Sequence, residues 1–285
     1  MPKVSMLLSC KDAEKTIEEC IESILSQTFK DFNLFIFDDF SKDSTVSKIL
    51  SFKDKRITII KSSKNIGTYA SKNFMLKNFV NSEFVALHDA DDISDPDRLK
   101  RQVEVLEKNK DISCLGTAVL EFWEDNSTTP HTQSSNISLD RKRENRYPEE
   151  ISRDVLSEVH ETLTDKNRYH EYLEKKFCMN GTVMFRKETL DKLGGWDGST
   201  MIAGDTEIFL RSLSIGNIKN ISDVLYKRRF HENSLTSSKN VGIKSGIRKN
   251  YNLSLADIVK KSMNSIVKRD FYHPEFDFEV LNCAD

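Results

Sequence analysis

FVALHDADD, residues 84–92, is a short apolar run that ends in three carboxylates within four residues. Such a run is typical of a buried strand, which would deliver Asp89, Asp91 and Asp92 to the edge of a sheet. Carboxylates gathered at a strand end repel one another and lose hydration. A hard divalent cation, bound together with a phosphate-bearing ligand, would offset this repulsion and loss of hydration most simply. The stretch therefore predicts a nucleotide-binding site.

A second apolar run also ends in acids. Residues 33–37 (NLFIF) lead directly into Asp38 and Asp39. In open parallel sheets, ligands bind beyond the carboxyl ends of the strands, so we expect both acidic ends and Asn65-Ile66-Gly67 to line one crevice. Ordinary turn chemistry is the alternative for Asp38 and Asp39, because Asp is common in turns. A solvated loop is the alternative for residues 89–92.

Strand-like and helical patterns alternate along the chain. Strands are expected at 4–9, 33–38, 56–60, 84–89, 112–122 and 182–185, and helices at 17–25, 45–52, 70–79 and 96–109. This alternation predicts an α/β fold, a Rossmann-like three-layer α/β/α sandwich with a mostly parallel central sheet.

The chain of 285 residues is long enough for one large α/β domain with an extension. We assign residues 1–237 to that domain, with a nucleotide-binding half at 1–110 and a second half at 111–237. A charged insertion is expected at about 124–176, where apolar residues become sparse. Within it we expect a polar loop at 126–138 and a helix with a narrow apolar stripe formed by Ile151, Val155, Val159 and Leu163. Residues 238–285 are expected to form a basic helical extension.

Within the extension, residues 239–269 contain eight basic residues and a single acid, Asp257. Ser254 is a candidate N-cap for a helix with an apolar stripe and a basic side. Such a helix could lie on an anionic membrane. The alternative is that the stripe docks on the domain and the lysines face water. The stripe comprises Leu255, Val259, Met263, Ile266 and Val267, beside Lys260, Lys261, Lys268 and Arg269.

Charge and cysteine usage argue against several protein classes. A net charge of −2 argues against nucleic-acid binding over the whole surface, which requires a clearly basic domain. The five cysteines are dispersed without a CxxC pair, which is typical of a reducing compartment and not of a disulfide framework or zinc site. The chain shows no signal-peptide pattern and no run of about 20 apolar residues, so we expect a cytoplasmic protein, at most peripheral at the inner membrane face.

Five motifs occur in a recognisable order. They are a strand and helix ending at Gln27-Thr28, the acidic turn 38–43, Asn65-Ile66-Gly67 with Lys72-Asn73, the element Asp89-Ala90-Asp91, and Gly194-Gly195-Trp196-Asp197 followed by Gly204–Arg211. Together they resemble the motifs of the inverting family 2 glycosyltransferases, which have the GT-A fold. The resemblance runs from about residue 3 to about residue 237. It implies that the first half binds a nucleotide sugar and that the second half faces the acceptor.

The resemblance also implies roles for single residues. The metal ligands would be Asp91, Asp89 and His231, holding Mn²⁺ or Mg²⁺. The donor-binding residues would be Asp38, Asp39, Asn65, Gly67, Lys72 and Asp89. Asp205 would be the catalytic base, with Glu207 as the alternative. The chain departs from the family pattern at Gly204, which replaces an acid, at Lys72, which replaces arginine, and at Phe40, which replaces glycine.

The implied reaction is a metal-dependent, inverting sugar transfer from a nucleotide donor, in particular a UDP-sugar, to a glycan or lipid-linked acceptor in surface polysaccharide or glycoconjugate synthesis. A single displacement needs one carboxylate to take the acceptor's proton and no covalent nucleophile. A metal-dependent nucleotidyltransferase and a non-catalytic glycan-binding or scaffold member of the fold are the alternatives. At the level of residues, Asp205 and Glu207 could simply complement a helix dipole, and His231 could be a surface residue.

Overall fold

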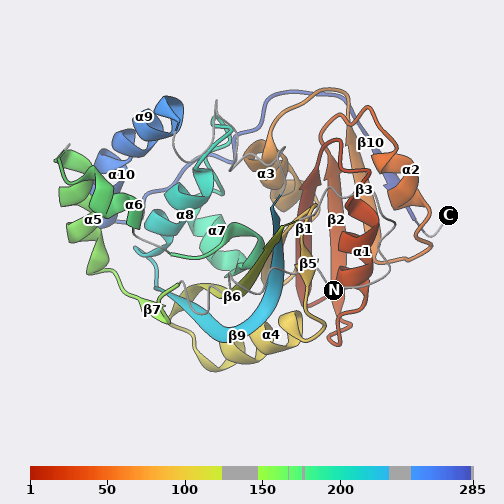
Figure 1. Ribbon diagram of the computed structural model, residues 1–285, viewed down its shortest axis with the longest axis horizontal. Coiled ribbons are helices and arrows are strands. Elements are labelled where there is room, and N and C mark those ends of the chain that lie inside the picture. Colours follow the sequence, from red (N-terminus) through yellow and green to blue (C-terminus); the bar gives the residue numbers. More distant parts are fainter. Residues whose placement is uncertain (124–146, 166, 175–176, 231–244, 284–285) are drawn as a thin grey trace.

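The computed structural model describes residues 1–123, 147–165, 167–174, 177–230 and 245–283. One sheet runs through the molecule, and helices lie on both sides of it (Figure 1). Its strands are β1 (Val4–Cys10), β2 (Phe32–Asp38), β3 (Ile57–Ser62), β4 (Phe84–Asp89), β5 (Ile93–Ser94), β6 (Ile112–Trp123), β7 (Glu150–Ile151), β8 (Met184–Arg186), β9 (Asn217–Phe230) and β10 (Phe278–Asn282).

The helices follow the alternation expected from the sequence. They are α1 (Ile17–Leu25), α2 (Thr45–Leu50), α3 (Thr68–Asn78), α4 (Arg98–Lys108), α5 (Val155–Thr164), α6 (Tyr169–Glu174), α7 (Lys187–Leu193), α8 (Gly204–Ser212), α9 (Gly246–Ser254) and α10 (Ala256–Ser262), with a 3₁₀ turn at Asn180–Thr182.

The order across the sheet is β10-β3-β2-β1-β4-β8-β6-β9-β5, with β7 paired to β9. β1 is parallel to both β2 and β4, β3 is parallel to β2, and the long strands β6 and β9 are parallel to each other. Antiparallel additions such as β8, between β4 and β6, complete the sheet. The expected α/β sandwich with a mostly parallel central sheet is confirmed.

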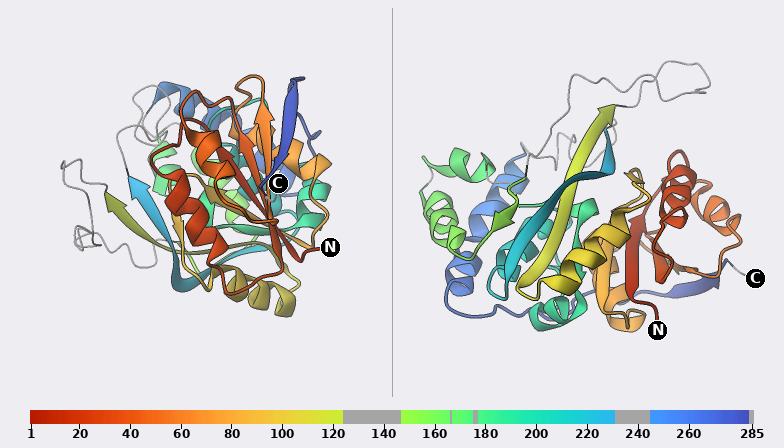
Figure 2. Two further views of the ribbon diagram at one scale, coloured as in Figure 1. Left: turned by 90° about the vertical axis from the view of Figure 1, so that its right-hand side faces the viewer. Right: turned by 90° about the horizontal axis from the view of Figure 1, so that it is seen from below.

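Side chains of β1 alternate between two apolar clusters, one on each face of the sheet. Met6 and Leu8 pack with residues of α1, α2 and α4, whereas Leu7 packs with residues of α3, α7, α8 and α10. Burial on both faces is typical of parallel strands between helical layers. Figure 2 shows these layers from two further directions, with β6 and β9 side by side.

The described part of the charged insertion contains β7, α5 and α6. Of the apolar stripe expected there, Val159 and Leu163 are buried on α5 and Ile151 is buried in β7. α5 packs against α10, so the insertion and the carboxyl-terminal helices support each other. The polar loop expected at 126–138 lies outside the described residues.

The carboxyl-terminal region differs from the single basic helix that the sequence predicted. Ser245, not Ser254, is the N-cap: its Oγ accepts a hydrogen bond from the amide of Arg248, and α9 ends at Ser254. After α10, residues 263–277, here called the crossing segment, run without a helix to the other side of the molecule. There β10 pairs with β3 (Figure 1).

The apolar stripe of this region faces the domain. Leu255 and Val259 are buried in the cluster that includes α3 and α8. Lys260 and Lys261 are exposed, and Ile266 lies beyond the end of α10. The structure thus shows the docked alternative for Leu255 and Val259, whereas Ile266 is 49% exposed. Within the described residues, every helix is too short or too polar to cross a bilayer.

The close approach of the crossing segment gives a first prediction. Gly194 has φ +71°, and a Cβ there would lie 1.5 Å from the carbonyl oxygen of Arg269. We expect Gly194→Ala to lower the free energy of unfolding by more than about 1 kcal/mol, because it combines an unfavourable φ with a steric overlap. Gly246→Ala is the control, since its Cβ position has nothing within 4 Å. Urea unfolding that finds the two variants equally stable would contradict this packing.

Candidate active site

The register of the parallel strands brings the two acidic strand ends to one edge of the sheet. Cys10 of β1 is paired with Asp38, and Ser9 is paired with Asp89. The acids therefore flank the carboxyl end of β1. The loop before α3 reaches the same edge, because the amide of Gly67 donates to the carboxylate of Asp39 at 2.9 Å.

The turn after β4 carries three acids with different surroundings. Asp89 and Asp91 are partly exposed, whereas Asp92 is buried. Burial, followed by the charges of Asp91 and Asp89, raises the pKa of Asp92 well above its usual range. Its Oδ1 accepts a hydrogen bond of 2.8 Å from the backbone amide of Arg229. Asp92 thus stabilises the turn, and Asp89 and Asp91 are the accessible carboxylates.

Two residues of β9 hold this turn, and the sequence analysis missed both. The Nε of Arg229 donates to the Asp91 carbonyl at 2.8 Å, and its Nη2 pairs with Glu19 of α1. The amide of Asp89 donates to the hydroxyl of Tyr226 at 3.2 Å. These contacts join positions 137 and 138 apart, so no local spacing indicates them.

Lys72 lies on α3 between acids of the two halves. It is 1% exposed, and its Nζ has no hydrogen-bond partner among the described residues. Burial lowers the pKa of Lys72, whereas the charges of Asp89 and Asp205 raise it. The ammonium group lies 5.5 Å from the centroid of the Tyr69 ring, but a buried ammonium group without a hydrogen-bond acceptor is costly. Its position is therefore suited to an anionic ligand such as a phosphate.

Asp205 lies in the first turn of α8 and contacts α3. The hydroxyl of Tyr69, another residue that the sequence analysis missed, donates to Asp205 Oδ1 at 3.3 Å. Gly204 packs against the same ring, since a Cβ there would lie 2.9 Å from Tyr69 Cδ2. Glycine lets α8 approach α3 at this point. This contact is a physical reason for the departure from the acid of the family pattern.

Glu207, the alternative base, belongs to a buried ion-pair network. It is fully buried, and its two carboxylate oxygens accept hydrogen bonds of 2.7 Å from Arg211. Arg269 also donates to Oε1, at 2.6 Å. A carboxylate held by two guanidinium groups and shielded from solvent is poorly placed to take a proton from a substrate. The geometry favours Asp205 over Glu207.

The two acids after β2 also differ. Asp39 accepts hydrogen bonds from the amides of Ile66 and Gly67 at 2.6 and 2.9 Å, so it holds the loop before α3. Asp38 is buried, and its Oδ1 has no hydrogen-bond partner within the part of the chain that the structure describes. Burial raises the pKa of both carboxyl groups. Asp38 is therefore the unsatisfied acceptor of the pair, and Asn65 beside this loop is exposed.

The accessible acids of the turn fit a divalent cation. Among the described residues, no three His, Cys, Asp or Glu side chains converge as a preformed metal centre. Mg²⁺ is often bound by one or two carboxylates together with phosphate oxygens and water, and Asp89 and Asp91 can provide those carboxylates. Burial, and to a smaller extent Asp91, raises the pKa of Asp89, which a cation would counteract. His231, the third expected ligand, lies outside the described residues.

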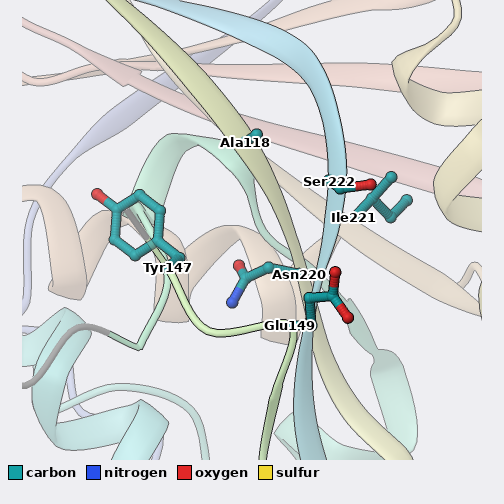
Figure 3. Close-up of a pocket in the computed structure, with 6 residues that line it drawn as sticks. All are labelled: Ala118, Tyr147, Glu149, Asn220, Ile221 and Ser222. Atoms are coloured by element: carbon teal, nitrogen blue, oxygen red, sulfur yellow. The ribbon is translucent and has the colours of Figure 1, made fainter. Parts of the chain in front are cut away.

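A separate small cavity lies beside β6 and β9 (Figure 3). Its volume of about 10 Å³ is sufficient for no more than about one water molecule. None of the expected site residues contributes to it, so it is not the candidate site. Its lining comprises Ala118, Tyr147, Glu149, Asn220, Ile221 and Ser222.

Several known proteins are similar to this chain in sequence. A sequence model described as Glycosyl transferase family 2 matches residues 5–194. The glycosyltransferase EpsE of Bacillus subtilis (strain 168) is 37% identical over 126 residues, which cover 43% of this chain and 45% of EpsE. The Escherichia coli UDP-Glc:alpha-D-GlcNAc-diphosphoundecaprenol beta-1,3-glucosyltransferase WfgD is 35% identical over 106 residues, which cover 37% of this chain and 42% of WfgD. The matched part spans less than half the length of either relative.

Solved structures share the fold. S. aureus TarS 1–349 in complex with UDP has a TM-score of 0.61 at 17% identity, covering 93% of this chain and 67% of TarS. The mannosyltransferase PcManGT from Pyrobaculum calidifontis, in complex with GDP-Man and Mn²⁺, has a TM-score of 0.59 at 14% identity, covering 90% of this chain and 74% of PcManGT. These likenesses confirm the GT-A fold, and the match over residues 5–194 shows that the chain belongs to glycosyl transferase family 2.

Proposed function

We propose that the protein transfers a sugar from a nucleotide-sugar donor, a UDP-sugar, to a hydroxyl group of a glycan or lipid-linked acceptor with inversion. The observation that carries this proposal is the position of Lys72, which lies between acidic residues of the two halves. Lys72 lies one turn after Tyr69 on α3, and the Tyr69 hydroxyl donates to Asp205 of α8 at 3.3 Å. The charges of Asp89, from the strand ends, and of Asp205 both raise the pKa of Lys72. A phosphate-binding group and a candidate base thus belong to one site.

On the donor side, Asp38 offers a buried acceptor to the nucleoside, and Lys72 offers a positive charge to the diphosphate. Asn65 and Gly67 form the loop that Asp39 holds beside Asp38. Asp89 and Asp91 would hold Mn²⁺ or Mg²⁺, with His231 as the expected third ligand. When bound, the cation stabilises the negative charge that develops on the leaving diphosphate.

On the acceptor side, Asp205 takes the proton of the attacking hydroxyl. The acceptor oxygen forms a bond to the anomeric carbon while the bond between that carbon and the diphosphate breaks, which inverts the configuration in one step. Tyr69 orients the carboxylate through its hydrogen bond to Oδ1. Gly204 makes room for the ring of Tyr69. The glycine that replaces the family's acid at this position therefore does not favour a non-catalytic role for the protein.

Relatives support the choice of substrates. The name of WfgD specifies a UDP-glucose donor and a lipid-diphosphate acceptor, and TarS was solved with UDP and with UDP-GlcNAc. We extend a UDP-sugar and a lipid-linked acceptor to this chain, acting in polysaccharide synthesis on the cytoplasmic side of a membrane. Since Leu255 and Val259 are buried, a membrane contact through 239–269 would rest on exposed residues, among them Lys260, Lys261, Ile247 and Ile266.

The base is tested by Asp205→Asn, which keeps an acceptor oxygen for Tyr69 but removes the carboxylate. Transfer should fall by about 10²–10⁴, while the UDP-sugar affinity and the melting temperature stay near wild type. Asp257→Asn, at an exposed acid of α10, is the control for the change in charge and should keep full activity. Wild-type turnover in Asp205→Asn would refute the mechanism, and release of sugar phosphate instead of nucleoside diphosphate would indicate nucleotidyl transfer.

The metal is tested by titrating UDP calorimetrically with Mn²⁺ or with EDTA. Chelation and Asp91→Ala should each weaken binding, because the cation offsets repulsion between the diphosphate and the acidic turn. Asp223→Ala removes an acid from an exposed ion pair with Arg101 and should bind UDP like the wild type. Equal UDP affinity with and without EDTA would remove the metal role of Asp89 and Asp91.

The different roles of Asp38 and Asp39 are tested by the same substitution at each position. Asp39→Leu leaves the amides of Ile66 and Gly67 without their acceptor and should cost about 1–3 kcal/mol of stability for each amide that stays unsatisfied. Asp38→Leu removes a buried charge and the long hydrogen bond of 3.4 Å from the amide of Ser41, so it should cost less stability than Asp39→Leu, but it should weaken UDP binding. If Asp38→Leu binds UDP with wild-type affinity, Asp38 is not a donor-binding residue.

A further inference from the structure

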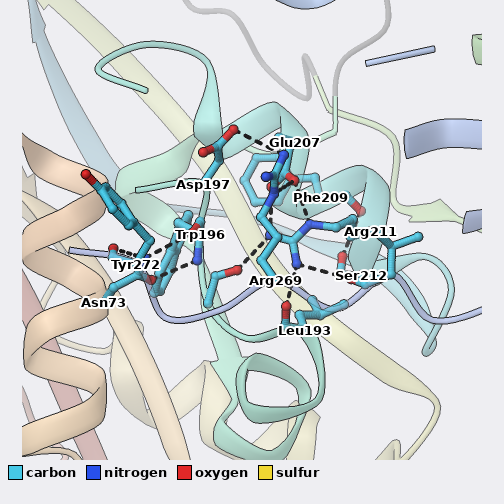
Figure 4. Close-up of polar contacts among 12 residues, drawn as sticks. Asn73, Leu193, Trp196, Asp197, Glu207, Phe209, Arg211, Ser212, Arg269 and Tyr272 are labelled. Carbon is cyan, nitrogen blue, oxygen red and sulfur yellow. Dashed lines mark hydrogen bonds and ion pairs between the residues drawn. The ribbon is translucent and has the colours of Figure 1, made fainter. Parts of the chain in front are cut away.

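The side chain of Arg269 connects the crossing segment to α8 (Figure 4). Its Nε donates to Oε1 of Glu207 at 2.6 Å, and its Nη2 lies 3.1 Å from Oδ2 of Asp197. Both carboxylates are buried. Solvent and salt therefore screen these ion pairs far less than they screen pairs on the surface.

The backbone of the crossing segment is fixed near the same point. The amide of Arg269 donates to the carbonyl of Leu193 at 2.8 Å. Further along, the carbonyl of Tyr272 accepts a hydrogen bond of 2.9 Å from Nδ2 of Asn73 (Figure 4). Asn73 directly follows Lys72 on α3. The crossing segment thus connects α8 with the helix that carries Lys72.

Asn73 also binds the turn that ends α7. Its Nδ2 donates to the carbonyl of Trp196 at 3.0 Å, and its Oδ1 accepts from the amide of Trp196 at 2.9 Å. Trp196 precedes Asp197, the second carboxylate that Arg269 contacts. α3, this turn, the crossing segment and α8 therefore form one hydrogen-bonded unit.

Arg269 is not needed to neutralise Glu207, although it is the guanidinium that pairs with Asp197. Arg211, on the same helix as Glu207, already binds both oxygens of that carboxylate. Asp197 also accepts a hydrogen bond from Tyr251 at 3.0 Å. Arg269 also fixes the orientation of α8 relative to the crossing segment.

The first turn of α8 is held from α3 by Tyr69, but its amino-terminal end has no side-chain cap among the described residues. Ala203 precedes the helix with φ +56°, a conformation that is uncommon for residues other than glycine. Asp205 and Glu207 both lie in this turn, so the hold on Glu207 also limits the movement of Asp205.

We propose that Arg269 is a positioning residue for the transfer reaction. Through Glu207 it holds the first turn of α8, so that Asp205 keeps its place beside Tyr69 and Lys72. Arg269 does not contact the reacting atoms. The proposal rests on the proposed function, because it takes Asp205 as the base.

Arg269→Met removes both ion pairs and leaves Glu207 with Arg211, so the protein should fold. We expect kcat to fall about tenfold to a hundredfold, since small misplacements of a catalytic group have effects of this size. KM for the donor and UDP affinity should stay near wild type, whereas Tm should fall because the buried carboxylate of Asp197 loses its guanidinium partner. Arg269→Lys restores one charged donor and should recover part of the lost kcat.

Arg153→Met is the matched control. Its Nη2 donates to the carbonyls of Ser262 and Met263, at the start of the crossing segment, without contact to α8. Its kcat should equal that of the wild type. An equal loss of kcat in Arg153→Met and Arg269→Met would overturn the specific role of Arg269.

Wild-type kcat in Arg269→Met would also overturn the proposal. So would a parallel loss of kcat, UDP affinity and Tm that Arg269→Lys does not repair, because Arg269 would then serve stability alone. Asp205→Asn belongs in the same series. If Asp205→Asn is inactive while Arg269→Met is fully active, only the positioning role fails. If Asp205→Asn is active, the assignment of the base fails instead.

Discussion

Parallel pairing of β1 with β2 and β4 is the constraint on which the rest of the site depends. The pairing sets Asp38 level with Cys10 and Asp89 level with Ser9, so acids from distant parts of the chain reach one edge. A slip of one residue in either ladder would turn every side chain of the slipped strand to the other face. Leu7 and its neighbours on β1 are buried in different clusters on the two faces, and this alternation opposes such a slip.

The concentration of carboxylates at this edge determines much of the surrounding structure. Buried carboxylates are costly unless they are paired or hydrogen-bonded. Arg229 reaches from β9 to the acidic turn, and Arg211 neutralises Glu207 inside the helical layer. Lys72 differs, because its ammonium group has no hydrogen-bond partner among the described residues. The protein thus satisfies the acids that shape the site and leaves a cation where an anionic ligand would bind.

The sequence predicted what depends on local patterns, and it could not predict what depends on distant contacts. Apolar runs ending in acids located β2 and β4, and helical spacing located α1 and α3. The bond between Tyr69 and Asp205 joins positions 136 apart, so no periodicity indicates it. The stripe from Leu255 to Val267 also fits a helix, but the chain leaves the helix after Ser262 and Arg269 docks on Glu207. Tertiary contacts override helix propensity there.

The expected site contains two pairs of acids, Asp38 with Asp39 and Asp205 with Glu207. The two members of each pair belong to the same sequence motif, but their surroundings in the structure differ. Asp39 uses its carboxylate to hold the loop before α3, whereas Asp38 keeps an unsatisfied oxygen. Glu207 is held by arginines, whereas Asp205 is partly exposed and accepts a single hydrogen bond from Tyr69. Buried polar groups normally have hydrogen-bond partners. An acid whose hydrogen bonds are all made within the protein therefore has a structural role. We therefore infer that Asp38 and Asp205, whose hydrogen bonds are less complete than those of Asp39 and Glu207, are the members of the two pairs that contact a substrate.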